Sequence, residues 1–174
     1  MAKKQNIDDL ISRLEEKEKE STIIYADEET EQVVIFELSG HIFAFPGKNV
    51  SEILPYDSIT TLPGLPHQFL GFITLRGSVE AVLDPRKILN LSIGDTGTAN
   101  RILISTNEEY TIGLWVDSVL DVADIPKSNM RPPLKTFDAI KAEFITGEFD
   151  YKDKHIVYLS ISRFFASLQT AVNE

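Results

Sequence analysis

The stretch GFITLRGSVEAVLD, residues 71–84, contains two short apolar runs separated by Arg76-Gly77-Ser78. Two runs rich in β-branched and aromatic residues, joined by a short glycine-containing segment, are typical of a β-hairpin. Gly71 lies inside the first run, where a glycine often marks the close approach of another backbone. The stretch therefore predicts two paired strands with Arg76 at the mouth of their connection.

Short strands with brief connections are predicted on both sides of this hairpin. The other candidate strand segments are QVVIFEL, HIFAFP, NVSEIL, RILIST, YTIGLWVDSVLDV, AEFITGEFDY and HIVYLSI. Proline-rich connections at residues 55–67 and 125–139 exclude a long helix or a central strand there. Eight to ten short strands at close spacing predict an all-β barrel or sandwich.

Two short helices are predicted within this body. PRKILNL, residues 85–91, places Pro85 at a first helical position. SRFFASLQTAV, residues 162–172, offers Ser162 as a helix cap and places Phe164, Phe165 and Leu168 on one face. The all-β body is therefore expected to carry small helices, one of them at its C-terminal end.

The N-terminal segment differs from the body in charge. Residues 1–31 hold five Lys or Arg and ten Asp or Glu, and Ile7, Leu10, Ile11 and Leu14 follow helical spacing. This segment is either a solvated helix that frays, since short isolated helices are marginal in water, or a helix that docks. We expect a charged extension over residues 1–30 and a domain over 31–170.

The two halves of that domain, residues 31–90 and 91–170, are loosely similar and predict two related subdomains. Each half has a glycine within an apolar hairpin, Gly71 and Gly113, and an aspartate after an apolar run, Asp84 and Asp117. The similarity is too weak to establish an internal repeat.

Composition favours a protein partner. The 174 residues are 43% hydrophobic, contain no cysteine and carry a net charge of −10. Disulfides and Cys-based metal sites are therefore excluded, and an acidic chain is a poor partner for nucleic acid. No run approaches the ~18 apolar residues of a membrane span, so direct membrane insertion is not expected. The aromatic residues Phe36, Phe43, Phe45 and Phe72 are interpreted as core residues, not as base-stacking groups.

The sequence offers no convincing catalytic constellation. His41, His67 and His155 are far apart in the chain, and neither a GxSxG nucleophile motif nor a phosphate-binding loop is present. Asp84 and Asp117 stand at strand ends, where an aspartate usually accepts backbone N–H groups. We therefore expect no enzyme activity, no cofactor and no metal. For Arg76 two interpretations stay open: a brace that pairs with Glu52 or Asp84, and a docking residue on a protein-binding surface.

Residues 50–84 resemble the CheW-like family of chemotaxis proteins. That family shows a V-x-E-I motif, an L-P-x-x-P loop, and a G-[VF]-I-N-L-R-G segment leading into V-I-P-V-x-D. The corresponding segments here are VSEI at 50–53, LPGLP at 62–66, GFITLRG at 71–77 and VEAVLD at 79–84. RILIST and YTIGLWVDSVLDV are similar to the second half of the family pattern. Thr74, Ala81 and Ser160 depart from it, where Asn, Pro and Asp are usual.

The resemblance implies two intertwined five-stranded SH3-like barrels that act by contact and not by catalysis. It implies a cytoplasmic adaptor that couples the signalling domain of chemoreceptors to the regulatory domain of a histidine kinase. Each barrel would offer a hydrophobic surface, one of them for the kinase's similar domain. Receptor contact is implied at or near Val50, Glu52, Gly71 and Arg76, with Gly113 close to the groove between the barrels. Alternatives are a divergent scaffold serving surface motility or a second-messenger output and, less favoured, a nucleic-acid-binding barrel.

Overall fold

The computed structural model describes residues 12, 28–55, 59–93, 99–134 and 139–172. The chain divides into two compact units, Met1–Thr30 and Glu31–Glu174, and the architecture below is that of the second unit. Apart from Ser12, the residues of the helix predicted around 7–14 lie outside the described part of the chain. Within the described part of the chain, no helix is long and apolar enough to cross a membrane.

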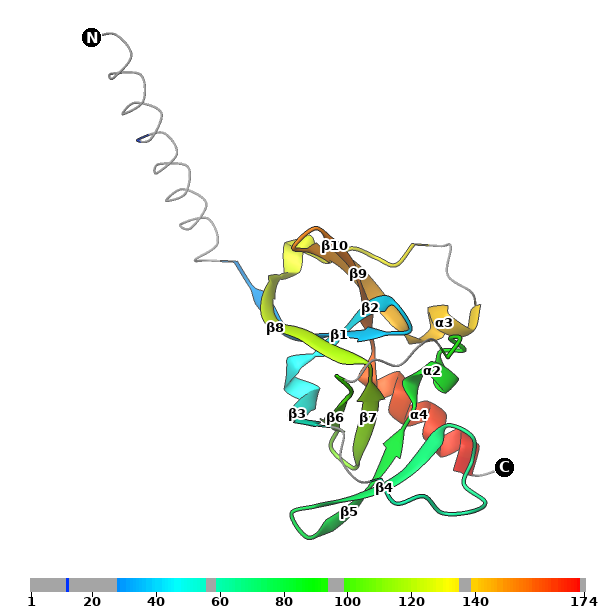
Figure 1. Ribbon diagram of the computed structural model, residues 1–174. Helices are drawn as coiled ribbons and strands as arrows, with labels where there is room; N and C mark the ends of the chain where they lie inside the picture. The colour runs from blue at the N-terminus through cyan, green and yellow to red at the C-terminus, as the bar shows by residue number, and fades with distance from the viewer. Residues whose placement is uncertain (1–11, 13–27, 56–58, 94–98, 135–138, 173–174) are drawn as a thin grey trace, which may run out of the picture. The chain divides into compact units, whose positions relative to one another are not determined.

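The second unit is an all-β structure built from two five-stranded sheets, which confirms the predicted fold class (Figure 1). Sheet A has the order β8-β1-β2-β10-β9, with strands β1 Thr30–Leu38, β2 His41–Pro46, β8 Ser118–Pro126, β9 Ile145–Tyr151 and β10 Lys154–Leu159. Sheet B has the order β3-β6-β7-β5-β4, with strands β3 Val50–Pro55, β4 Phe69–Leu75, β5 Ser78–Leu83, β6 Arg101–Thr106 and β7 Thr111–Val116.

The two sheets are intertwined because the chain passes between them twice. Sheet A takes strands from both ends of the domain, whereas sheet B takes the five strands between them. The boundary predicted near residue 90 therefore falls between β5 and β6, two strands of the same sheet. The segment YTIGLWVDSVLDV, predicted as one strand region, is divided at Asp117: β7 belongs to sheet B and β8 to sheet A.

Short helices lie between and after the strands. They are α2 Pro85–Ile88, α3 Ala139–Phe144 and α4 Ile161–Val172, with the 3₁₀ turns η1 Gly47–Asn49 and η2 Lys127–Asn129. Pro85 occupies the first turn of α2 as predicted, and the Asp84 side chain caps that helix by accepting the Arg86 N–H. Helix α4 begins at Ile161, so the prediction that Ser162 caps it is wrong: Ser162 lies inside the first turn.

The hairpin of residues 71–84 has the predicted pairing. Strands β4 and β5 are antiparallel, and Leu75 pairs with Ser78, which leaves Arg76 and Gly77 as a two-residue turn. Both turn residues have positive φ, +49° and +89°. This is the type I′ geometry that suits the twist of a hairpin and usually selects Asn-Gly. A bulky residue such as Arg is uncommon at the first position of this turn.

An internal repeat becomes visible in the strand register. Strands β9 and β10 reproduce β4 and β5 with a constant shift of 76 positions, and both hairpins have a register irregularity at the same place. The parallel pairing of β5 with β7 likewise has its counterpart in β10 with β2. Gly71 therefore corresponds to Gly147 and Asp84 to Ser160. The loose match of Gly71 with Gly113 and of Asp84 with Asp117, seen in the sequence, is not the structural repeat.

The main core lies where the two sheets and α4 meet. Buried aromatic and aliphatic side chains from β1, β2, β5, β6, β7 and α4 form it, including Phe36, Phe43, Phe45, Leu83, Leu103, Leu114 and Phe164. The core assignment is thus confirmed for Phe36, Phe43 and Phe45. It is wrong for Phe72, which is only half-buried and lines two surface hollows.

We expect Phe164→Ala to lower the free energy of unfolding by about 3–5 kcal/mol, because a fully buried ring would leave a cavity. The ring packs edge-on against Phe45, with 5.5 Å between centroids, and at a tilt against Phe144, with 4.9 Å between centroids. Urea unfolding measures the loss, with Ser162→Ala, an exposed position of the same helix, as the control. A change below about 1 kcal/mol for Phe164→Ala would contradict the assigned core.

Candidate protein-binding surface

Arg76 forms an ion pair with Glu52 of β3. The Arg76 Nη2 atom lies 2.9 Å from Glu52 Oε1, and the two side chains are 79% and 25% exposed. Strands β3 and β4 are the two edges of sheet B, so the pair connects the hairpin turn to the opposite edge. The bracing interpretation is thus confirmed with Glu52 as the partner, while Asp84 pairs elsewhere. Because Arg76 stays largely exposed, bracing does not prevent it from contacting another protein.

Sheet A repeats this arrangement with Lys152, the counterpart of Arg76. Lys152 has a φ of +48° in the β9–β10 turn, and its Nζ lies 2.8 Å from Asp121 Oδ2 on β8, the opposite edge of sheet A. Tyr151 also donates its hydroxyl to Asp121, at 2.9 Å. These two hydrogen bonds, that of Lys152 first, hold the pKa of Asp121 below its usual value. Lys152 and Asp153 therefore form the turn of the β9–β10 hairpin.

Three of the predicted site residues lie in one row across sheet B. Glu52 pairs with Ile104, Ile104 with Gly113, Gly113 with Val82, and Val82 with Gly71. Glu52, Gly113 and Gly71 therefore lie in one line across the five strands of sheet B, joined by four successive residue pairs.

The two glycines of this row are places of close packing. Gly71 has a φ of +150°, and a Cβ there would overlap the carbonyl oxygen of Thr60. Thr60 and Phe72 exchange two backbone hydrogen bonds of 2.8 Å, so the approaching backbone belongs to this chain. At Gly113 a Cβ would lie 2.8 Å from Ile102 Cγ2. Both glycines therefore shape the sheet and present no side chain to a partner.

Val50 lies at the start of β3, two residues before Glu52. Its N–H closes the η1 turn by donating to Gly47, and its side chain is partly buried against the main core. Val50 thus positions the beginning of the edge strand while staying partly accessible.

A buried arginine that the sequence analysis missed accounts for Asp84 and Asp117. The Arg86 guanidinium donates to both oxygens of Asp84, at 2.8 and 3.0 Å, and its Nη1 lies 3.5 Å from Asp117 Oδ1. It also stacks 4.0 Å from the centre of the Trp115 ring. Both carboxylates serve as counterions and accept backbone N–H groups, those of Arg86 and Ser39. They form a structural cluster and not an exposed acid–base pair.

The histidines show no joint arrangement. His41 and His67 are exposed at separate places, and His155 lies beside Asp150 and Glu148. In the described part of the chain, no three His, Asp or Glu residues are grouped as metal ligands would be.

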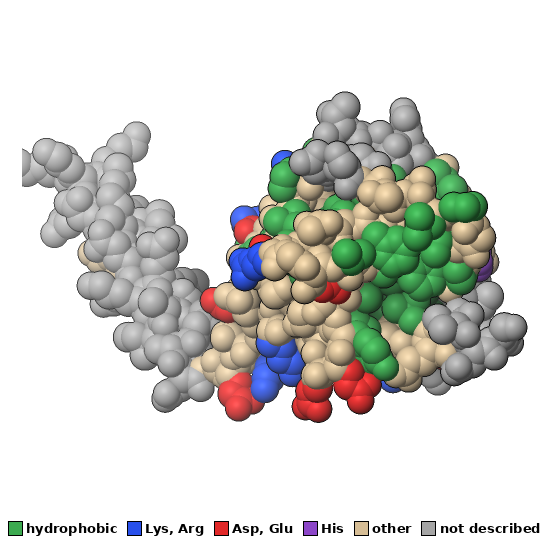
Figure 2. Space-filling model, turned by 90° about the horizontal axis from the view of Figure 1, so that it is seen from below, with side chains coloured by type: hydrophobic (Ala, Val, Ile, Leu, Met, Phe, Trp, Pro, Cys, Tyr) green, Lys and Arg blue, Asp and Glu red, His purple; other side chains and the backbone are tan. Residues whose placement is uncertain are grey.

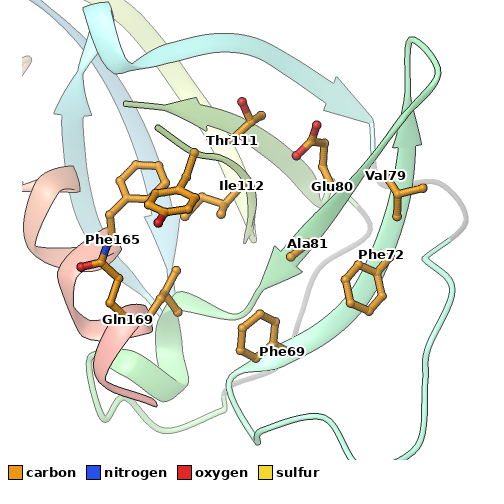
Figure 3. A pocket seen from close by; sticks show the side chains of 11 residues that line it. Phe69, Phe72, Val79, Glu80, Ala81, Thr111, Ile112, Phe165 and Gln169 are labelled. Atoms are coloured by element: carbon orange, nitrogen blue, oxygen red, sulfur yellow. The ribbon is translucent and has the colours of Figure 1, made fainter. Parts of the chain in front are cut away.

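An exposed apolar face covers the outer side of the β4–β5 hairpin. We call it the hairpin face and define it by Leu62, Phe72, Thr74, Val79 and Ala81, of which Leu62 and Val79 are 52% and 67% exposed. A hollow of about 630 Å³ opens beside it, between β4, β5, β7 and α4 (Figure 3). Such clustered exposure of apolar side chains is typical of a protein contact site.

Comparison with known proteins identifies the family. Residues 32–169 match the model of the CheW-like domain, so this chain belongs to the CheW-like family. It is 31% identical over 101 residues to the chemotaxis protein CheW of Bacillus subtilis, a match covering 58% of this chain and 65% of that protein. It is 32% identical over 102 residues to protein FrzA of Myxococcus xanthus, covering 59% and 63%. The chain thus spans slightly less than two thirds of these relatives' length.

A solved structure supports the same fold. The scaffolding protein TtCheW from Thermoanaerobacter tengcongensis superposes with a TM-score of 0.67 at 28% identity, covering 76% of this chain and 90% of that one. The arrangement of two intertwined five-stranded sheets is therefore that of the family.

We expect the two arginines to differ sharply in their contribution to stability. Arg86→Ala would leave the buried Asp84 carboxylate unpaired and should cost about 3–5 kcal/mol of unfolding free energy. Arg76→Ala removes an exposed ion pair and should cost at most about 1 kcal/mol. Urea unfolding of the two variants side by side measures the difference, and equal losses would contradict the assignment.

Gly71→Ala should destabilise the domain by more than Gly40→Ala. Both glycines have positive φ, but only Gly71 has a backbone atom in the place that a methyl group would take. Gly40→Ala should therefore cost about 1 kcal/mol from backbone conformation alone, and Gly71→Ala clearly more. Thermal unfolding of both variants tests this prediction. A larger loss of stability for Gly40→Ala than for Gly71→Ala would show that the backbone at Thr60 moves to make room for the methyl group.

Proposed function

We propose that this chain is a non-catalytic adaptor that couples the cytoplasmic signalling domain of chemoreceptors to the regulatory domain of a histidine kinase. Membership of the CheW-like family supports this function. The observation that carries it is the Glu52–Arg76 pair, which holds an exposed guanidinium at a fixed place on the edge of sheet B.

The receptor contact centres on this pair. Arg76 offers several N–H donors, and the single bond to Glu52 leaves others directed to solvent. Arginine is favoured at interfaces because its planar group combines directional bonds with stacking. Val50 and Glu52 belong to β3, the opposite edge strand of sheet B, which the ion pair joins to the hairpin turn. Gly71 and Gly113 act through packing, by fixing the distance between strands on which the contact depends.

The kinase contact uses the hairpin face. An apolar surface gains free energy when a partner buries it, and this gain does not depend on precise orientation. The regulatory domain of the kinase, which the family resemblance describes as similar to this one, is its partner in this proposal. Both contacts together place the chain between receptor and kinase in the cytoplasm.

A catalytic role receives no support from the acidic residues. Asp84 and Asp117 are engaged by Arg86 and by backbone N–H groups, so neither carboxylate is available to a substrate. The adaptor would therefore act by holding partners together.

A second candidate is the same scaffold role in a different signalling pathway. The identity to FrzA, 32%, is nearly the same as that to CheW of Bacillus subtilis, 31%, so similarity alone does not favour one pathway. The departures Thr74 and Ala81 both lie on the hairpin face, where they would alter the choice of partner.

Reconstitution tests the adaptor function. Receptor signalling domains, the kinase and this chain are combined, and kinase autophosphorylation is measured with the chain present and omitted. We expect the chain to be required for receptor-dependent change in kinase activity. Unchanged activity and unchanged assembly would refute the coupling function, while coupling with only one set of receptors would identify the pathway.

Arg76→Ala should weaken receptor binding by about tenfold or more, as expected for an interface arginine worth over ~1.4 kcal/mol. Lys152→Ala is the matched control, because Lys152 occupies the same place in the hairpin of sheet A. Binding to receptor signalling domains is measured by calorimetry, with circular dichroism to confirm folding. Equal effects of the two variants, or none from Arg76→Ala in a folded protein, would refute the docking role.

A further inference from the structure

The internal repeat places an equivalent of the hairpin face on sheet A, and its chemistry is different. The hydrophobic side chains on the hairpin-face side of the domain gather into one continuous area, seen in Figure 2. In the β9–β10 hairpin of sheet A, Glu148 and His155 occupy the places of Phe72 and Val79. The same positions of the fold are thus apolar in one sheet and ionic in the other.

Glu148 is a carboxylate with little access to water. Its side chain is 5% exposed, and it accepts the backbone N–H of Leu134 over a long 3.4 Å. A buried carboxylate is costly unless a positive charge or several hydrogen bonds compensate it. His155 is placed to do so, because its Nε2 lies 3.5 Å from the same oxygen, Oε2.

The His155 ring lies between two carboxylates. Its Nδ1 is 3.3 Å from Asp150 Oδ1, while Nε2 faces Glu148. A neutral imidazole has one N–H and one bare nitrogen, so it presents a donor to only one of the two. The imidazolium has two N–H groups and presents one to each carboxylate. The arrangement of both carboxylates around the ring therefore suits the protonated form.

The charged groups around His155 carry one negative charge in excess. Arg131 Nη2 lies 2.8 Å from Asp150 Oδ2, and that hydrogen bond, followed by the one from His155, holds the pKa of Asp150 below its usual value. One guanidinium against two carboxylates leaves a net charge of −1, which a proton on the ring brings to zero. Two further titratable residues are Lys154, which precedes the ring on β10, and His41, at the exposed start of the adjoining strand β2.

The same carboxylates hold a segment that covers the outer edge of sheet A. We call residues 131–134 the edge segment, because it runs beside β9, an edge strand. Arg131 exchanges two backbone hydrogen bonds of 2.9 Å with Glu148. Beyond them, the segment is attached by the Arg131–Asp150 ion pair and by the Leu134 N–H on the Glu148 carboxylate.

We propose that protonation of His155 controls how firmly the Leu134 end of the edge segment is held on β9. The imidazolium keeps the Glu148 carboxylate in place for the Leu134 N–H. When the proton is lost, a bare ring nitrogen faces the carboxylate, and Glu148 gains hydration by turning away, so the bond to Leu134 is given up. The imidazolium is the low-pH form, so the segment is held more firmly below the range in which histidine titrates and less firmly above it.

This inference is independent of the proposed adaptor function. It concerns the edge of sheet A and needs no partner. The two backbone hydrogen bonds of Arg131 do not involve the Glu148 carboxylate, so the pH-dependent loosening is confined to the part of the segment beyond them.

The test measures exchange of the Leu134 amide with water by NMR in the full chain, corrected for the intrinsic pH dependence of exchange. We expect the amide to be about fivefold better protected at about pH 6 than at about pH 8, the size of effect typical of a partly exposed ion pair. His155→Gln should reduce this difference to less than about twofold. Glu148→Gln, which keeps an acceptor oxygen and removes the charge, should also abolish the pH dependence.

His41→Gln is the matched control, because it removes an exposed histidine from the strand beside β10, and it should leave the pH dependence intact. Circular dichroism confirms that each variant is folded, and if Glu148→Gln does not fold, His155→Gln decides alone. Equal protection at both pH values in the unaltered chain, or better protection at the higher pH, would overturn the inference. So would a pH dependence that survives His155→Gln or that is lost with His41→Gln.

Discussion

The buried Arg86 side chain contacts two carboxylates and the Trp115 ring at the place where the two sheets meet. Its guanidinium binds Asp84 at the end of β5 and faces Asp117 between β7 and β8. Asp117 in turn accepts the Ser39 N–H and donates its own N–H to Glu37 of β1, so the cluster joins sheet B to sheet A. A buried arginine needs such partners because its desolvation is costly. Arg86 and Asp117 therefore lie at the place where the chain passes from sheet B to sheet A, and Asp117 makes the hydrogen bonds that join the two sheets there.

The two equivalent hairpins, β4–β5 and β9–β10, show which structural features the two sheets share. Both hairpins retain a glycine beside a crossing backbone, a cation with positive φ in the turn, and a carboxylate on the opposite edge strand. The two glycines are required by the backbone that passes close to them, and the two ion pairs join the hairpin turn to the opposite edge strand of each sheet. The outward side chains carry no such constraint, and there the two copies have separated into an apolar and an ionic surface. Divergence is thus concentrated where partners would be recognised.

The sequence predicts much of this fold because strand alternation, turn residues and proline-rich connections are local signals. The pairing of Arg76 with Glu52 could also be considered from the sequence, since both residues belong to recognisable motifs. Arg86 was missed because nothing in PRKILNL distinguishes a buried arginine from a solvated one. Phe72 was assigned to the core because both faces of β4 are apolar, and alternation cannot tell which one is covered. The repeat escaped detection because outward residues such as Val79 and His155 differ completely in polarity.

The parallel pairing of β2 with β10 joins strands at opposite ends of the domain. During synthesis, β1 and β2 leave the ribosome first, but sheet A stays incomplete until the segment around Tyr158 has emerged. Sheet B, whose five strands are contiguous, has all its strands available earlier. Contacts between distant segments slow folding, because loop closure precedes their gain in free energy. A nascent chain would therefore leave the β10 side of strand β2 unpaired until the segment around Tyr158 has been synthesised.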